Sequence, residues 1–174
     1  NYDQVRRAID MGPCGIMLPS VDDLDDLASV RDAVLLPPRG RRRPGGWGNH
    51  WMSDFNYTTW RDEFEADFVV LPQIETRKGL SNVKAIAADD IVTAIAVGPY
   101  DLSAELGCCW DPQDERLKTA LSDIREAGRA AGKNMWMIGN GPELVKEGYT
   151  FVCVGEPSYV MGAALGKIVQ DCKA

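Results

Sequence analysis

The sequence has little of several features that would point directly to a function. Its 174 residues include a single histidine, His50, so a Ser-His-Asp or Cys-His constellation is difficult to assemble. No segment approaches the ~20 apolar residues of a membrane span. Positive charge is not in excess either, because the net charge is -7 and the pI is about 4.7. This balance argues against nucleic acid or an anionic membrane as the main partner.

A disulfide framework is also missing. The five cysteines are odd in number, and their spacing matches neither a secreted disulfide scaffold nor a zinc site. The first residues lack a signal-peptide pattern. We therefore expect free thiols and a cytoplasmic location.

Apolar runs that alternate with amphipathic stretches predict a parallel α/β sheet with right-handed crossovers. An opening helix is expected to end at Gly12. Five strands are expected at 15–19, 68–74, 91–97, 134–138 and 150–154. Further helices are expected at 22–34, 58–64, 76–88, 113–131, 141–147 and 158–172. No linker interrupts this order, so residues 1–174 are expected to form one domain.

One long stretch, at about 36–60, does not fit this rhythm. Proline, glycine and arginine dominate its first part and predict an irregular loop, which closes with the short helix at 58–64. Its aromatic residues argue that the loop is ordered. Arg41, Arg42 and Arg43 could hold a carboxylate substrate or an acid of a neighbouring subunit, although a short charged run is more often a solvated turn.

Two strand ends carry the residues best suited to chemistry. Glu75 follows the run at 68–74 and Asp101 follows the run at 91–97, so both carboxylates are expected at the mouth of the sheet. Strand alternation puts Gln73 on the same face as Glu75, and Pro99 on the same face as Asp101. Two such carboxylates suit a hard divalent cation. Each has another interpretation, since Asp101 could be a helix N-cap and Glu75 a solvated acid.

Several motifs together resemble the HpcH/HpaI aldolase family of class II, metal-dependent pyruvate aldolases. They are PPRGRR at 37–42, QIET at 73–76, GPYDLS at 98–103 and ELG at 105–107. The resemblance runs along nearly the whole chain. It implies a (β/α)₈ TIM barrel, of which this chain would cover about strands 4–8.

The resemblance also implies roles for individual residues. Glu75 and Asp101 would bind Mg²⁺, Mn²⁺ or Co²⁺, and Asp10 would support a catalytic histidine. The pyruvate moiety would contact Gln73, Gly98, Pro99 and Tyr100. The family's histidine and its substrate-binding arginine lie on earlier strands, which are expected to precede Asn1. Family members form homo-oligomers, commonly hexamers.

The expected reaction is retro-aldol cleavage of a 4-hydroxy-2-oxo acid to pyruvate and an aldehyde, without nucleic acid or membrane partners. Two alternatives stay open. One is a non-catalytic or assembly subunit, and the other is a lyase acting on an acyl-CoA ester of the malyl-CoA or citryl type.

Overall fold

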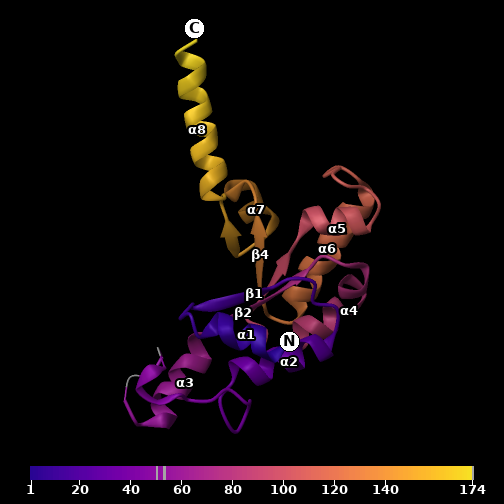
Figure 1. Cartoon of the computed structure of the whole chain (residues 1–174). Coiled ribbons are helices and arrows are strands. Elements are labelled where there is room, and N and C mark those ends of the chain that lie inside the picture. Colours follow the sequence, from indigo (N-terminus) through magenta and orange to yellow (C-terminus); the bar gives the residue numbers. More distant parts are fainter. Residues whose placement is uncertain (50, 53, 174) are drawn as a thin grey trace.

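A single parallel sheet organises the chain (Figure 1). The structure is a computed structural model that describes residues 1–49, 51–52 and 54–173. The strands follow the chain in the order β1-β2-β3-β4-β5, and every neighbouring pair is parallel. They are β1 (Gly15–Leu18), β2 (Val69–Ile74), β3 (Ala94–Val97), β4 (Asn134–Ile138) and β5 (Phe151–Cys153). The predicted α/β class and the five strands are confirmed.

Helices connect the strands, and the chain begins and ends with a helix. They are α1 (Tyr2–Ile9), α2 (Leu24–Val34), α3 (Tyr57–Asp67), α4 (Arg77–Ala88), α5 (Pro99–Glu105), α6 (Glu115–Ala130), α7 (Gly141–Glu147) and α8 (Pro157–Asp171), with a short 3₁₀ turn at Gly46–Gly48. Helix α3 is longer than predicted, and α5 occupies a stretch that the sequence predicted as loop. Gly98 is the N-cap of α5 and Pro99 its first residue, where the fixed φ of proline favours a helix start.

The two faces of the sheet belong to different apolar clusters. Val70, Ile95 and Met135 belong to the main apolar core, which also contains the buried faces of the helices. The other face has a small cluster that includes Leu71 and Ala96. Strand alternation continues this second face from Leu71 to Gln73 and Glu75, as predicted.

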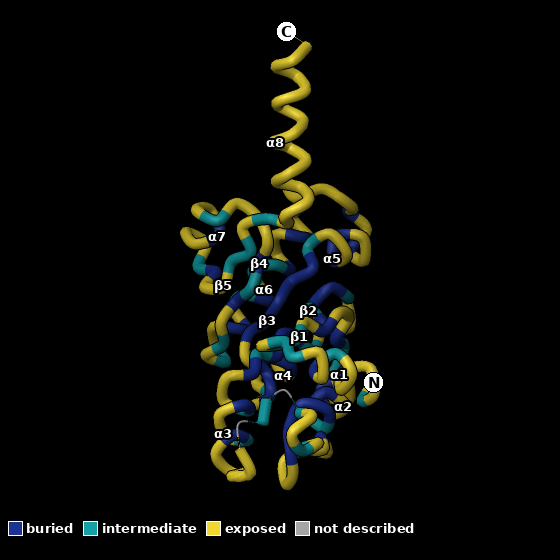
Figure 2. The backbone as a smooth tube through the Cα atoms, turned by 60° about the vertical axis from the view of Figure 1, so that its left-hand side comes forward, coloured by how far each residue is buried: buried dark blue, intermediate teal, exposed yellow. Residues whose placement is uncertain are grey.

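Different helices lie toward the two ends of the sheet. Figure 2 shows α5, α7 and α8, which follow β3, β4 and β5, at the upper end, and α3 at the lower end. Helix α8 projects away from the sheet and has no buried residue. Within the described ranges, no helix is long and apolar enough to cross a membrane. All five cysteines are free thiols, as predicted.

Candidate active site

Glu75 is held in one position by the turn that follows β1. It is the single residue between the end of β2 and Thr76, the N-cap of α4. The residue is 7% exposed. Its Oε1 atom accepts two hydrogen bonds from Ser20, one from the backbone N–H at 2.8 Å and one from the hydroxyl at 2.9 Å. The interpretation of Glu75 as a solvated acid is therefore wrong.

Gln73 and Gly98 form the wall beside this carboxylate. Gln73 pairs with Ala96 in the β2–β3 register, and the N–H of Gly98 donates to the carbonyl of Ile74 at 3.2 Å. A Cβ atom at position 98 would lie 2.4 Å from Glu75 Oε2 and 2.5 Å from Gln73 Nε2. Because real Cβ contacts are essentially never this short, a side chain at position 98 would displace the ends of the Glu75 and Gln73 side chains. The missing side chain allows both polar groups to approach the backbone of β3.

Asp101 lies in the first turn of α5, three residues after Gly98. Gly98 is the N-cap, so the alternative prediction of Asp101 as a cap is wrong. The strand-face argument that paired Asp101 with Pro99 is also wrong, because the helix begins at Pro99 and ends the two-residue alternation. Asp101 is exposed, whereas Pro99 is half-buried.

The end of α5 is tied to the start of α4, next to Glu75. Arg77 donates through Nε to the carbonyl of Glu105 at 2.6 Å. Consequently, the turn that carries Glu75 and the helix that carries Asp101 are held against each other.

The oxygen donors where the strands finish suit a hard divalent cation. They comprise the Glu75 and Asp101 carboxylates, and hard divalent cations prefer oxygen ligands. Among the described residues, no group of three or more His, Cys, Asp or Glu side chains could hold a metal ion. A cation held by the Glu75 and Asp101 carboxylates would leave coordination positions for substrate oxygens, as catalytic metal sites do.

Tyr100 belongs to an exposed aromatic pair next to Asp101. Its ring lies 5.9 Å from the ring of Trp110, and 58% of Tyr100 is exposed. A side-chain hydrogen bond with Cys109 raises the pKa of the Tyr100 phenol above its usual value. The phenol is therefore neutral at physiological pH and adds no charge to this end of the sheet.

Asp10 lies at the opposite end of the sheet from Glu75. It is the C-cap of α1, five residues before β1 begins, whereas Glu75 follows the last residue of β2. Asp10 accepts a hydrogen bond from Arg42 Nη2 at 3.0 Å and lies 3.6 Å from Arg6 Nε. Within one copy of the chain, Asp10 therefore belongs to an arginine cluster and not to the Glu75 site.

The three arginines of the loop differ strongly from one another. Only 3% of the Arg42 side chain is exposed, and its guanidinium lies 5.6 Å from the centre of the Phe64 ring. Burial lowers the pKa of Arg42, and the nearby Asp10 charge opposes this shift. Arg41 forms an exposed ion pair with Asp32, and Arg43 is exposed. The prediction of a solvated turn is thus wrong for Arg42, while His50 lies outside the described residues.

Sequence reasoning missed two residues that position the acids. Ser20 follows β1 at the same end of the sheet where Glu75 follows β2, so the strand-end rule extends to it. Arg42 was one of three equivalent arginines in the sequence. Only the folded chain shows that it is the buried one that pairs with Asp10.

Comparisons with known proteins agree with this geometry. The family model described as HpcH/HpaI aldolase/citrate lyase matches residues 2–160. A hydroxypyruvate/pyruvate aldolase of Chromohalobacter salexigens is 30% identical over 164 residues, which cover 89% of this chain and 63% of that protein. A 4-hydroxy-2-oxo-heptane-1,7-dioate aldolase of Salmonella heidelberg is 30% identical over 159 residues, covering 87% of this chain and 59% of that protein. The chain thus spans about three fifths of the length of these curated relatives.

Solved structures extend the comparison to the fold. A HpcH/HpaI aldolase/citrate lyase family protein from Burkholderia cenocepacia superposes with a TM-score of 0.87 at 25% identity, over all of this chain and 70% of that one. The HpcH/HpaI aldolase from Desulfitobacterium hafniense gives a TM-score of 0.86 at 21% identity, over 100% of this chain and 70% of that one. The five parallel strands are therefore part of a TIM-barrel fold, as predicted. With this fold, the matched family model and the paired strand ends, the chain belongs to the HpcH/HpaI aldolase/citrate lyase family.

Proposed function

We propose that the protein is a metal-dependent carbon–carbon lyase that cleaves a 4-hydroxy-2-oxo acid into pyruvate and an aldehyde. The observation that carries this proposal is the arrangement of Glu75. One carboxylate oxygen is fixed by Ser20, and the other faces Gly98 and the amide of Gln73. The family and the relatives named as pyruvate and 4-hydroxy-2-oxo acid aldolases support the same reaction.

At the end of the sheet that carries Glu75, some residues would bind the cation and others would orient the substrate. Glu75 and Asp101 would hold Mg²⁺, Mn²⁺ or Co²⁺, which supplies Lewis acidity toward the oxygens of the ketoacid. Gln73 would donate its amide hydrogens to the ketoacid. The backbone at Gly98, Pro99 and Tyr100 would form the floor under it, where the absent side chain at position 98 permits close approach.

Cleavage also needs a base that takes the proton of the 4-hydroxyl group as the C3–C4 bond breaks. The electrons of that bond pass to the pyruvate fragment, which is then protonated at C3. Asp10 would orient this base and raise its basicity. Because Asp10 lies at the other end of the sheet, it would serve the site of a neighbouring copy. The proposal therefore includes a homo-oligomer, a hexamer by the family resemblance, and the five free thiols fit a cytoplasmic location.

The test is pyruvate formation by the intact protein from a 4-hydroxy-2-oxo acid, with Mn²⁺ and with a chelator. We expect pyruvate only when Mn²⁺ is present, and a loss of about 100-fold in Asp101→Asn because a charged cation ligand is removed. Asp111→Asn is the matched control, since Asp111 lies in the following loop and accepts from the N–H of Gln113. Formation of no pyruvate would favour an assembly subunit, and cleavage of malyl-CoA alone would favour an ester lyase.

A further inference from the structure

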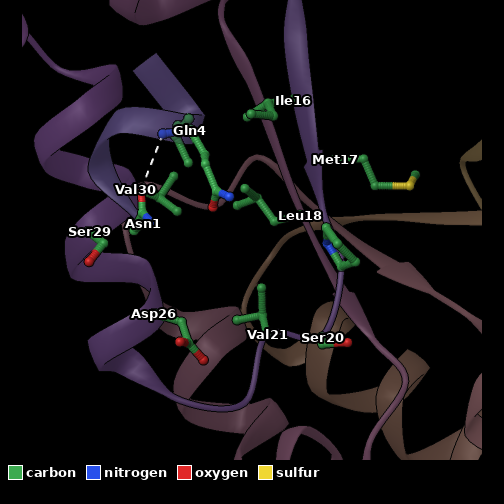
Figure 3. A pocket seen from close by; sticks show the side chains of 12 residues that line it. Asn1, Gln4, Ile16, Met17, Leu18, Ser20, Val21, Asp26, Ser29 and Val30 are labelled. Atoms are coloured by element: carbon green, nitrogen blue, oxygen red, sulfur yellow. Dashed lines mark hydrogen bonds between the residues drawn. The ribbon is translucent and has the colours of Figure 1, made fainter. Parts of the chain in front are cut away.

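Ser20 has an unusual backbone conformation for its residue type. Its φ is +51°, and it is the one non-glycine residue with positive φ in the part of the chain that the structure describes. Side chains disfavour this left-handed region, so it persists only where the surroundings enforce it. Ser20 lies at the turn from β1 into α2, beside a pocket whose walls are drawn in Figure 3.

This conformation points two donors of one residue at the same atom. The N–H and the hydroxyl of Ser20 both donate to Glu75 Oε1, at 2.8 and 2.9 Å. Among the described residues, none donates a hydrogen bond to Glu75 Oε2. That second oxygen is the one that faces Gly98 and the Gln73 amide. The two oxygens of Glu75 therefore have separate environments before any ligand arrives.

The turn that carries Ser20 is itself fixed to the next strand and helix. The N–H of Val21 donates to the carbonyl of Gln73 at 3.4 Å, and the Asn82 side chain donates to the carbonyl of Asp22 at 2.8 Å. The hydroxyl of Thr76 donates to the Asp22 carboxylate. These contacts surround the Ser20–Glu75 pair on the β2–α4 side. Ser20 is thus preorganised and does not have to be ordered when a ligand binds.

We propose that Ser20 is a positioning residue, which holds Glu75 Oε1 so that Oε2 alone is presented to the divalent cation. This inference rests on the proposed function, because it takes Glu75 as a cation ligand. Two donors on Oε1 draw some charge from the carboxylate, which opposes cation binding. The gain in orientation is larger, since removing outer partners of ligating side chains typically costs 10–100-fold in metal affinity.

Mn²⁺ affinity of the intact protein, measured by titration calorimetry, tests this role without relying on activity. The informative variant is Ser20→Gly, which keeps the backbone N–H donor, suits a φ of +51° and removes the CH₂OH side chain with its hydroxyl donor. We expect Mn²⁺ to bind about tenfold more weakly, at the lower end of the range for outer partners. Ser29→Ala is the control, because Ser29 lies on α2, on the other wall of the same pocket (Figure 3).

Titration of Glu75→Gln with Mn²⁺ in parallel distinguishes a failure of the role of Ser20 from a failure of Glu75 as a cation ligand. Weak Mn²⁺ binding by Glu75→Gln together with wild-type binding by Ser20→Gly would overturn the role of Ser20 and leave the proposed function intact. The Ser20 bonds would then only join the two turns, and a lower melting temperature of Ser20→Gly would be their whole effect. Wild-type binding by Glu75→Gln would instead remove Glu75 as a ligand, and the role of Ser20 with it.

Discussion

The sheet carries a polar cluster at each end, and the two clusters are built in opposite ways. Where the strands finish, short turns place Glu75, Gln73 and Gly98 close together, and no residue that the structure describes donates to the second carboxylate oxygen of Glu75. Where the strands begin, a long loop folds Arg42 against Asp10, and the acid is paired within its own chain. The first cluster holds a carboxylate whose Oε2 accepts no hydrogen bond from the described residues, whereas in the second Asp10 is paired with Arg42 Nη2. This difference is why we assign substrate binding to the first end.

The comparison also limits how the two clusters can cooperate. Asp10 lies where the strands begin and Glu75 where they finish, so one copy of the chain does not bring them together. Contact between the two ends is available only between copies, as symmetric oligomers permit.

One added methyl group at Gly98, in the cluster that contains Glu75, should lower activity most strongly. Gly98→Ala would place a Cβ atom 2.4 Å from Glu75 Oε2 and 2.5 Å from Gln73 Nε2, so both groups must move. Displacements of this size in an active site can cost about 100-fold, and we expect that loss in kcat/KM for pyruvate formation. Gly162→Ala is the control, because a Cβ atom in that part of α8 would meet nothing within 4 Å. Unchanged activity in Gly98→Ala would mean that substrate binds elsewhere.

Cooperation between copies predicts that two inactive variants restore each other. Asp10→Asn removes the carboxylate charge at the start of the strands, and Glu75→Gln removes the one at their end. Each variant alone should be nearly inactive. When the two are co-expressed, half of the copies retain Glu75 and half of their neighbours retain Asp10. Activity should therefore return to about one quarter of the wild-type value in a mixed oligomer. A mixture no more active than the separate variants would exclude Asp10 from the neighbouring site.

The ion pair between Asp10 and Arg42 should contribute to the stability of the fold. Asp10→Ala removes the partner of a guanidinium that is only 3% exposed. Since Asp10 itself is half-exposed, we expect the free energy of unfolding to fall by about 2 kcal/mol, less than for a fully buried pair. Asp32→Ala breaks the exposed pair with Arg41 and should cost less than about 1 kcal/mol. Urea unfolding of both variants measures the difference, and equal losses would contradict the special role of Arg42.

Much of the fold could be predicted because apolar runs and helix caps are local signals. The β2 strand and α7 lie close to their predicted positions for this reason. The start of β3 was predicted three residues early, because Ile91 and Val92 are buried without being in the strand. There the N–H of Ile91 donates to the Asp89 carboxylate, which forms a turn instead. Burial alone does not distinguish such a turn from a strand.

The candidate site was predictable only in part. Glu75 and Gln73 follow from strand alternation, which is a property of neighbouring residues. The partners of the acids come from distant segments, since Ser20 is 55 residues from Glu75 and Arg42 is 32 residues from Asp10. Which arginine of three becomes buried depends on how the loop packs against Phe64. Such information exists only in the folded chain.

The most direct test of the account is the effect of Glu75→Gln on Mn²⁺ affinity, compared with Glu65→Gln. Glu65 is a suitable control because its side chain is also buried, at 5% exposed, and it accepts hydrogen bonds from Leu36 and Arg39 away from the candidate site. We expect Glu75→Gln to weaken Mn²⁺ binding at least tenfold and Glu65→Gln to leave it unchanged. Equal Mn²⁺ affinity in the two variants would contradict the account.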